Sequence, residues 1–267
     1  MSHDIDDRDW AVPRHDVSVL AERGSRYCVL IPVINEGRRI LDQLERIQKL
    51  DLGVDVVLAD GGSTDGSNDP DVLRGLGVRA VLVKRGTGKL SAQLRMGFAF
   101  ALREGYDGVV TIDGNGKDDV AAIPRFVAAL EAGAGFVQGS RFIPGGLGIN
   151  TPRSRRLAIT LLHAPVTSLA AGKRYTDTTN GFRGHSRELL LDPRVSPMRQ
   201  VFDTYELLAY LPIQAARLGY GCTEVPVTRA YPADGTVPTK IKGRRGELNL
   251  VGILARAALG RYAPEPV

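Results

Sequence analysis

Short apolar runs alternate with segments of helical periodicity between residues 27 and 138, and this alternation is the feature that most constrains the fold. The apolar runs are residues 28–31, 54–59, 78–83, 109–112 and 136–138. Between them, apolar side chains recur at helical spacing, in the sets Ile40/Leu44/Ile47, Leu90/Leu94/Phe98/Leu102 and Ile123/Phe126/Leu130. Strands that alternate with helices predict an α/β fold with a mostly parallel, doubly wound sheet flanked by helices. Pro32 is expected to end the first strand.

The chain is long enough to form one large domain. It has 267 residues, of which 43% are hydrophobic, and such a chain can bury a full core. We expect an N-terminal extension over residues 1–26, a single domain over residues 27–250, and a C-terminal helix and tail over residues 251–267. The extension contains no apolar segment of the kind that a signal peptide requires.

Polar side chains follow three of the predicted strands, at the point where each strand ends. They belong to the segments 32–36, 60–63 and 113–115. The carboxyl ends of parallel strands meet at one edge of the sheet, which is where ligands bind in such folds. Three acidic ends would repel one another unless a cation or sugar hydroxyls lay between them. The sequence therefore predicts a binding site at this edge.

Asp113 and Asn115 are the candidate ligands of a cation. If the chain stays extended here, their side chains share one face, and carboxylate and amide oxygens suit Mg²⁺ or Mn²⁺ rather than zinc. An alternative stays open, because Asp-Gly and Asn-Gly are also common turn pairs. In that interpretation Asp118 and Asp119 simply begin the next helix.

The charge of the chain favours an anionic partner. A net charge of +5 and a pI near 9.3 suit a nucleotide, a lipid phosphate or a membrane surface. Nucleic acid is not expected, because only 6% of the residues are aromatic and the arginines form no long block. Two distant cysteines indicate a reducing compartment, so we expect a cytoplasmic protein that contacts the membrane face peripherally.

The glycine-rich segment 84–89 does not form a phosphate-binding loop of a known type. It lacks the spacing of a Walker motif, and Leu90 stands where a Ser or Thr should be. A basic turn before a helix remains, and through it Lys89 could meet a phosphate. An ordinary strand-to-helix turn is the alternative.

The second half of the chain carries the candidate acceptor residues. Arginines 141, 153, 155 and 156 precede an apolar segment, residues 157–171, that is too short to span a membrane. They could hold a phosphate carried on a lipid, or they could be solvated residues at the start of a packed helix. Asp177 and Arg183 could form a structural ion pair or position the acceptor. Further on we expect a helix over 203–218 kinked at Pro212, an edge strand at 225–227 and a basic loop over 229–245.

Taken in order, these segments resemble glycosyltransferase family 2 of the GT-A fold. Residues 32–36, 60–66 and 113–117 are similar to the family patterns P-x-Y-N-E, D-D-G-S-x-D-G and D-A-D-x-Q. Residues 139–141 and 177–183 are similar to G-S-R and D-x-T-S-G-F-R. The resemblance covers about residues 27–243 and is strongest to the dolichol-phosphate and polyprenyl-phosphate mannose or glucose synthases.

The resemblance implies a role for each matching residue. The base and ribose of the nucleotide donor would be contacted by Pro32, Ile34, Glu36 and Asp60. The diphosphate of the donor would be contacted by Asp113, Gly114 and Asn115, and by two basic residues late in the chain, Arg229 and Lys240. The implied reaction is an inverting transfer of a hexose from a GDP- or UDP-sugar to a polyprenyl phosphate or another phosphate or hydroxyl acceptor, with Mg²⁺ or Mn²⁺. A phosphate acceptor is already ionised near pH 7, whereas a hydroxyl acceptor would need a base such as Asp177 or Asp118.

The chain departs from the family pattern at two residues of the cation motif. Asn115 replaces a carboxylate and Lys117 replaces a glutamine, so metal binding should weaken and Lys117 could take over part of the diphosphate charge. Two other functions therefore stay open. A sugar-1-phosphate nucleotidylyltransferase would share the architecture, although segment 32–36 lacks its glycine-rich signature. A non-catalytic sugar-nucleotide-binding protein would fit the weakened cation motif.

Overall fold

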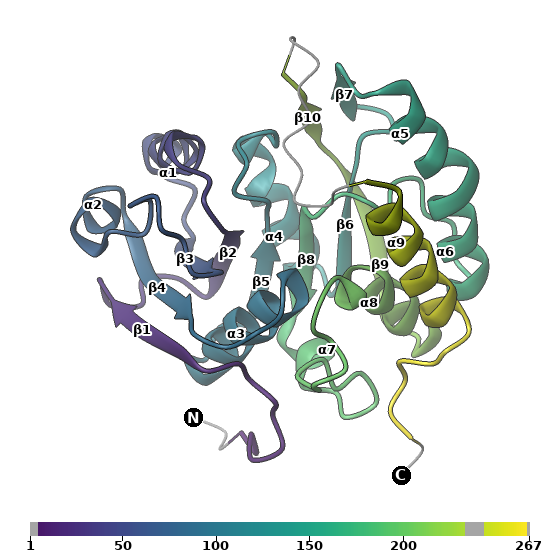
Figure 1. The fold of residues 1–267 in the computed structure, drawn as a ribbon, viewed down its shortest axis with the longest axis horizontal. Coiled ribbons are helices and arrows are strands. Elements are labelled where there is room, and N and C mark those ends of the chain that lie inside the picture. The colour runs from purple at the N-terminus through teal and green to yellow at the C-terminus, as the bar shows by residue number, and fades with distance from the viewer. Residues whose placement is uncertain (1–4, 233–242, 266–267) are drawn as a thin grey trace.

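A mixed β-sheet forms the centre of the protein (Figure 1). The computed structural model describes residues 5–232 and 243–265. Within them the sheet has eight strands, in the order β1-β4-β3-β2-β5-β8-β6-β9. Their bounds are β1 His15–Val19, β2 Tyr27–Val33, β3 Asp55–Asp60, β4 Val78–Lys84, β5 Gly108–Thr111, β6 Phe136–Ser140, β8 Arg183–Ser186 and β9 Cys222–Pro226. Strands β4, β3, β2 and β5 run parallel, as β6 and β9 do, whereas β1 and β8 are antiparallel to their neighbours.

Helices cover both faces of this sheet because apolar side chains alternate along its strands. Val29 and Ile31 of β2 pack in one core, while Cys28 and Leu30 pack in the other. The first core includes α1 Arg38–Leu50, α2 Pro70–Gly75 and α4 Ile123–Glu131. The second includes α3 Leu90–Arg103, α6 Ala164–Ala171, α7 Arg187–Leu191, α8 Glu206–Arg217 and α9 Gly243–Ala258. The expected α/β layering is confirmed.

Most predicted elements are present, with shifted ends. Strand β2 continues through Pro32 to Val33, so the expectation that Pro32 ends it is wrong; Pro32 lies opposite Ala59 of β3. The predicted edge strand is β9, which pairs only with β6 within the described chain and starts at Cys222. Helix α8 contains Pro212 and runs from Glu206 to Arg217.

Two strands of the sheet were not predicted. Strand β1 comes from the expected N-terminal extension and pairs along β4, from His15 opposite Lys84 to Val19 opposite Ala80. Strand β8 enters between β5 and β6, where Arg183 lies opposite both Thr111 and Gln138. The second half of the chain is therefore built into the middle of the sheet.

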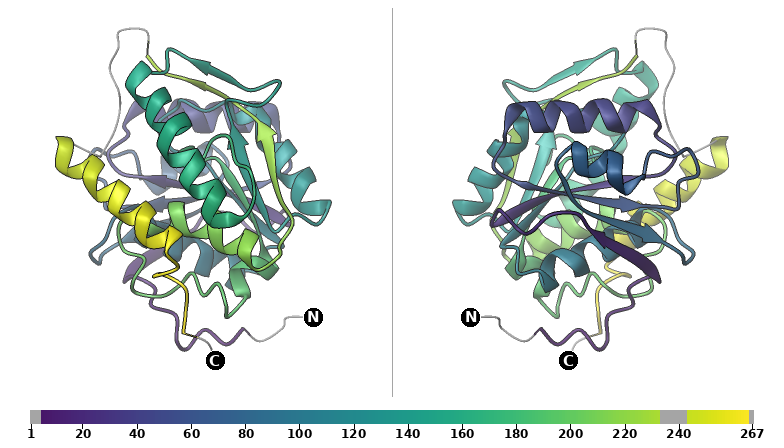
Figure 2. Two further views of the ribbon diagram at one scale, coloured as in Figure 1. Left: turned by 90° about the vertical axis from the view of Figure 1, so that its right-hand side faces the viewer. Right: turned by 90° about the vertical axis from the view of Figure 1, so that its left-hand side faces the viewer.

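A helical excursion lies between β6 and β8. It begins with β7 Leu147–Ile149, which pairs with β10 Thr228–Ala230, and continues through α5 Arg153–Ala158, a π-helical turn Ile159–His163 and α6. Helix α9 runs beside α6 (Figure 2). Because α9 starts at Gly243, the expected domain boundary after residue 250 falls inside this helix. No helix of the described residues has the length and apolar character needed to cross a bilayer.

Candidate active site

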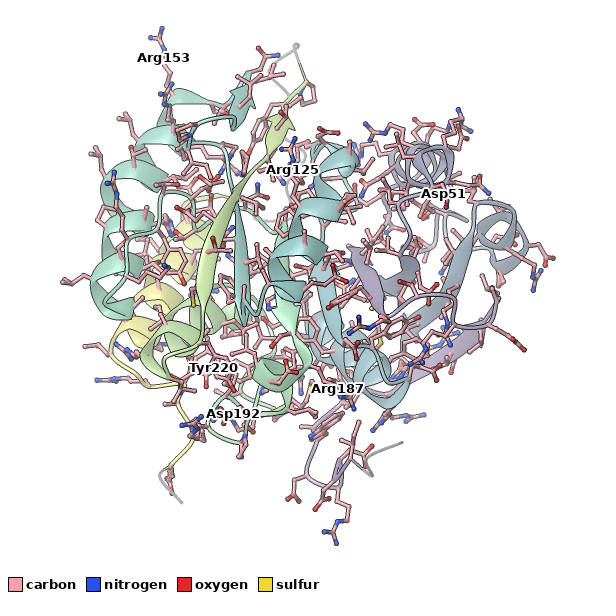
Figure 3. The ribbon with its side chains drawn as sticks, turned by 180° about the vertical axis from the view of Figure 1, so that it is seen from behind. Asp51, Arg125, Arg153, Arg187, Asp192 and Tyr220 are labelled. Carbon is pink, nitrogen blue, oxygen red and sulfur yellow. The ribbon has the colours of Figure 1, made fainter. Side chains whose placement is uncertain are left out.

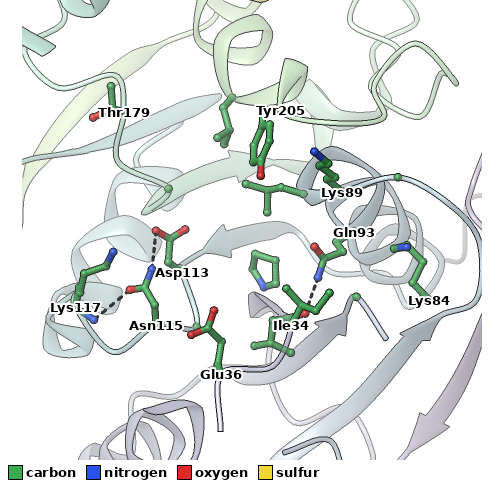
Figure 4. Close-up of a pocket in the computed structure, with 18 of the residues that line it drawn as sticks. Ile34, Glu36, Lys84, Lys89, Gln93, Asp113, Asn115, Lys117, Thr179 and Tyr205 are labelled. Carbon is green, nitrogen blue, oxygen red and sulfur yellow. Dashed lines mark hydrogen bonds between the residues drawn. The ribbon is translucent and has the colours of Figure 1, made fainter. Parts of the chain in front are cut away.

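A cavity of about 380 Å³ opens at the carboxyl edge of the parallel strands (Figure 4). Its walls come from the residues that follow β2, β3, β4 and β5, together with the loops before β8 and α8. The charged residues that line it are Glu36 and Asp113 on the acidic side and Lys84, Lys89, Lys117, Arg155 and Arg229 on the basic side. Five cations against two carboxylates favour an anionic ligand.

Arg229 bridges two carboxylates at the centre of this site. Its NH2 group donates to Asp113 Oδ2 at 2.7 Å, and its NH1 group donates to Asp118 Oδ2. A backbone bridge between Asp118 and Arg229 brings the two segments together, 111 residues apart in sequence. Burial raises the pKa of Asp113, but the Arg229 charge outweighs this effect and holds that pKa below its ordinary value. Asp113 is therefore ionised near neutral pH.

Asn115 and Lys117 occupy a turn that follows Asp113. Asn115 Nδ2 lies 3.4 Å from Asp113 Oδ2, and the backbone N–H of Lys117 donates to Asn115 Oδ1 at 3.3 Å (Figure 4). Burial, and then the Arg229 charge, lower the pKa of Lys117 to about 8. Asp119 caps the following 3₁₀ turn by accepting from the N–H of Ala121. The segment is a turn, as the alternative interpretation held, and it also places side chains in the cavity.

The side chains around Asp113 could bind a metal ion only if an anionic ligand supplied further ligating atoms. Within the described residues, no group of three His, Cys, Asp or Glu side chains could hold a metal ion. Asp113 and Asn115 offer oxygen atoms, the ligand type that Mg²⁺ and Mn²⁺ prefer. Because Asp113 is paired with Arg229, phosphate oxygens would have to complete the coordination.

The end of the cavity near β2 and β3 is lined by apolar residues and by the side-chain amide of Gln93. Pro32, Ile34 and Gly61 line it, and Gln93 Nε2 donates to the carbonyls of Val33 and Ala59, both at 2.7 Å. Gln93 thus ties the ends of two neighbouring strands together.

Asp60 lies beneath this end of the cavity. It is fully buried and accepts hydrogen bonds from the N–H groups of Gly62 and Ser63 and from Asn68 Nδ2. These bonds fix the loop after β3. The expected role of Asp60 in base recognition stays a prediction.

Arg141 and Asp177 form a buried, two-pronged ion pair. Arg141 Nε lies 2.6 Å from Asp177 Oδ2, and NH2 lies 2.8 Å from Oδ1. The prediction that Asp177 could form an ion pair with Arg183 is therefore wrong, because Asp177 pairs with Arg141 instead. Arg183 is buried and donates instead to the backbone carbonyls of Thr178, Asn180 and Leu208. This ion pair and these carbonyl contacts support the fold next to the cavity.

The other predicted acceptor residues are divided between the cavity and the surface. Arg155 lines the cavity, whereas Arg153 is exposed at the start of α5 and points away from the body of the protein (Figure 3). Gly114, Pro32, Ile34, Glu36 and Lys89 also line the cavity, and their expected contact with the donor stays a prediction. Lys240 lies outside the described residues.

Several residues that line the cavity were not predicted. They include Lys84, Gln93, Thr179, Gly181 and Tyr205. Lys84 could have been found, since it directly follows the third predicted strand, at the edge where the other polar ends meet. Gln93 and Tyr205 carry no such signal, because they belong to helical segments whose orientation only the fold determines.

Comparisons with known proteins identify the family of the chain. The chain matches the model of Glycosyl transferase family 2 over residues 28–192. It is 30% identical to an undecaprenyl-phosphate mannosyltransferase of Micrococcus luteus over 211 residues, 76% of this chain and 83% of that protein. It is 28% identical to a polyprenol monophosphomannose synthase of Mycolicibacterium smegmatis over 212 residues, 76% of this chain and 77% of that protein.

A solved structure shares the fold. Glucosyl-3-phosphoglycerate synthase of Mycobacterium tuberculosis, solved with Mn²⁺, UDP and phosphoglyceric acid, superposes with a TM-score of 0.62 at 21% identity. The superposition covers 91% of this chain and 80% of that chain. The resemblance to the family and the expected GT-A fold are both confirmed.

Proposed function

Since the chain belongs to glycosyl transferase family 2, we propose that it transfers a hexose, with inversion, from a nucleotide diphosphate sugar to a polyprenyl phosphate. The relatives named as polyprenol and undecaprenyl-phosphate mannose transferases support this acceptor. The observation that carries the proposal is the cluster of Arg229, Lys117 and Arg155 around a single cavity that also contains Asp113. In this reaction the acceptor phosphate attacks one side of the anomeric carbon while the nucleoside diphosphate leaves from the other, so positive charge is needed on both sides.

The residues around Asp113 serve the donor diphosphate in this proposal. Arg229 and Lys117 line the cavity beside Asp113 and would stabilise the charge that develops on the leaving diphosphate. Asp113 and Asn115 would hold a divalent cation, Mg²⁺ or Mn²⁺. When bound, such a cation neutralises diphosphate charge. Lys117 supplies a further positive charge that the family pattern does not have at this position.

The acceptor side needs no general base if the acceptor is a phosphate. Its second pKa is about 6, so an oxygen of the phosphate is ionised near pH 7 and can attack the anomeric carbon directly. Both candidate bases are held by arginines in buried pairs, Asp177 by Arg141 and Asp118 by Arg229. This commitment favours a phosphate acceptor over a hydroxyl acceptor.

A lipid acceptor implies that the protein works at a membrane face. Leu157, Leu161 and Leu169 are exposed by 56%, 74% and 87% along α5 to α6, next to Arg153 and Arg156 in the same helical segment. Exposed leucines beside arginines suit the surface of an anionic bilayer. The proposal is therefore a peripheral contact through this segment, which also carries the cavity residue Arg155.

The test is an incubation of the protein with radiolabelled nucleotide sugars, Mg²⁺ or Mn²⁺, and undecaprenyl phosphate. The proposal expects labelled lipid with at least one donor. Exchange of labelled pyrophosphate into the nucleotide sugar would instead indicate a nucleotidylyltransferase. Donor binding in calorimetry without any product would indicate a binding protein.

A further inference from the structure

Tyr231 comes immediately after β10 and contacts three residues that line the cavity. It is buried, with 4% of its surface exposed. Its backbone is held at both ends, because its N–H donates to the carbonyl of Ile149 at 3.0 Å and its own carbonyl accepts from Asn150 Nδ2 at 3.2 Å. The ring therefore has a fixed position relative to the residues that line the cavity.

Three cations of the cavity gather around this one ring. Lys117 Nζ lies 5.0 Å from the ring centroid, and the guanidinium carbons of Arg155 and Arg229 lie 5.7 and 5.9 Å from it. The phenol oxygen accepts a hydrogen bond from Arg155 NH1 at 3.3 Å. All three cations line the cavity, and the electron-rich face of an aromatic ring attracts cations at these distances.

We propose that Tyr231 is a positioning residue that assembles Lys117, Arg155 and Arg229 into one phosphate-binding cluster spanning the donor and acceptor sides of the cavity. This inference rests on the proposed function. Tyr231 acts through the three cations and makes no bond to the reacting atoms.

The cluster would not hold together on its own, because three like charges repel one another. Asp113 and Asp118 both pair with Arg229. The described contacts connect Arg155 to no carboxylate, and it is held in the group by Tyr231, through the hydrogen bond to the hydroxyl and the contact with the ring. Removing the hydroxyl should therefore loosen Arg155, which keeps only its ring contact, while the contacts of Arg229 with its carboxylates remain.

The electrostatics of Tyr231 agree with this arrangement. Burial raises the pKa of its phenol, but the charges of Arg229, Arg155, Arg141 and Lys117 outweigh burial and lower that pKa below the ordinary value. At Tyr106 and Tyr210 the net shift is upward, with burial as the largest cause. Tyr231 thus lies in a region of positive potential that extends from the cavity.

Two variants separate the two contributions of the side chain. Tyr231→Phe keeps the ring and its contacts with all three cations but removes the hydrogen bond to Arg155. Tyr231→Leu removes both. Tyr210→Phe is the matched control, because Tyr210 is also buried and its hydroxyl donates to the carbonyl of Val195 at 2.7 Å, with no cation of the cavity involved.

The experiment measures transfer to undecaprenyl phosphate and, separately, the binding of inorganic pyrophosphate by calorimetry. Tyr231→Phe should raise the KM for undecaprenyl phosphate by about 3- to 10-fold, the effect of one hydrogen bond to a charged group, with kcat and pyrophosphate affinity nearly unchanged. Tyr231→Leu should in addition weaken pyrophosphate binding by about 3- to 10-fold, since all three ring contacts with cations are lost. Tyr210→Phe should leave the acceptor KM and pyrophosphate binding at the wild-type values.

Equal acceptor KM values for wild type and Tyr231→Phe would overturn the inference, as would a KM change of the same size in Tyr210→Phe. Unchanged pyrophosphate binding in Tyr231→Leu would overturn the donor side of the cluster. Failure of the wild type to make lipid product would reject the proposed function instead. The calorimetry of Tyr231→Leu would then still decide whether the ring organises the cations.

Discussion

The guanidinium of Arg229 lies 2.7 Å from the carboxylate of Asp113, so the residue expected to hold a cation already carries an arginine. A divalent cation at Asp113 would have to share this carboxylate with Arg229 or displace it. Arg229 has a second carboxylate in Asp118, and it could keep that contact while its bond to Asp113 loosens. Cation binding and the position of Arg229 should therefore be linked.

Asp113→Ala should abolish transfer. The change removes the candidate cation ligand and leaves Arg229 paired with Asp118 alone, and losing such a charge at a reacting centre costs on the order of 10²- to 10³-fold or more in rate. Asp119→Ala is the control, since Asp119 is an exposed acid that caps a 3₁₀ turn. Transfer assays over a range of Mn²⁺ concentrations measure both. Normal turnover of Asp113→Ala at any metal concentration would remove Asp113 from the mechanism.

The pair of changes Asn115→Asp and Lys117→Gln should tighten the binding of Mg²⁺ or Mn²⁺ in the presence of donor. Together they shift the local charge by two units towards negative, which increases the attraction for a divalent cation. Lys117→Ala alone should lower kcat even at saturating metal, because a cation beside the diphosphate is lost. Calorimetry and transfer kinetics are the measurements. If the double variant binds metal no better than the wild type, the departure from the family pattern has no effect on the cation.

Pyrophosphate binding should weaken as the pH rises through about 8, the pKa to which burial and Arg229 lower Lys117. Above this pH Lys117 becomes neutral and one cation of the cavity is lost. The protonation of Lys117 affects the stability of the fold in the opposite direction: stability rises with pH, whereas pyrophosphate binding weakens. Between about 8 and the ordinary value of 10.5, the unfolded chain binds more protons than the folded protein, so this residue makes the free energy of unfolding rise with pH.

Lys117→Arg tests the source of this dependence, because a guanidinium keeps its charge throughout the range. Calorimetric titrations with pyrophosphate at pH 7 to 9.5 should show the step in the wild type and a flatter profile in the variant. The same step in both proteins would assign it to another group.

Arg141→Ala should destabilise the fold rather than the acceptor complex alone. Its ion pair with Asp177 is buried, with 1% and 0% of the two side chains exposed, and removing one partner of a buried pair costs about 3–5 kcal/mol. Arg153→Ala, at an exposed site, should change the free energy of unfolding by less than about 0.5 kcal/mol. Urea denaturation measures both. Equal stability of the two variants would show that the Arg141–Asp177 pair contributes little to folding.

Gly181→Ala should displace Asp113 and lower kcat. A Cβ at residue 181 would overlap Asp113 Oδ1, and a carboxylate moved by about 1 Å can cost on the order of 10²-fold in rate. Gly252→Ala is the control in helix α9, where an added Cβ meets no atom within 4 Å. It should be neutral or slightly stabilising. Wild-type kcat in Gly181→Ala would mean that Asp113 tolerates movement.

The sequence predicts those parts of the fold whose residues have a local pattern. Runs such as Val109 to Ile112 are apolar and β-branched, so their strands and the acidic ends that follow could be assigned directly. Strand β8 could not, because Arg183, Gly184, His185 and Ser186 show no apolar pattern although all four are buried. Their burial depends on neighbours on both sides, and no local pattern encodes it.

The same reasoning explains which parts of the site were predicted. Asp113, Asn115 and Lys117 lie within five residues of one another, so one motif reveals them. The partner of Asp177 lies 36 residues away and the partner of Asp118 lies 111 residues away. Several carboxylates and arginines are compatible with such pairs, and only the packing of β10 and of the loop after β6 selects among them. Tyr231 is a site residue for the same kind of reason, since its cations come from three separate segments.

The place of β8 between β5 and β6 also affects how a growing chain can fold. Thr111 Oγ1, at the end of β5, donates to the carbonyl of Gly181, 70 residues later. At about 5–20 residues per second, a ribosome needs roughly 4–14 s to synthesise such a segment. During that interval the open edge of β5 has no partner and could pair with other chains. A nascent chain of this protein should therefore depend on chaperones most strongly between the synthesis of β5 and that of β8.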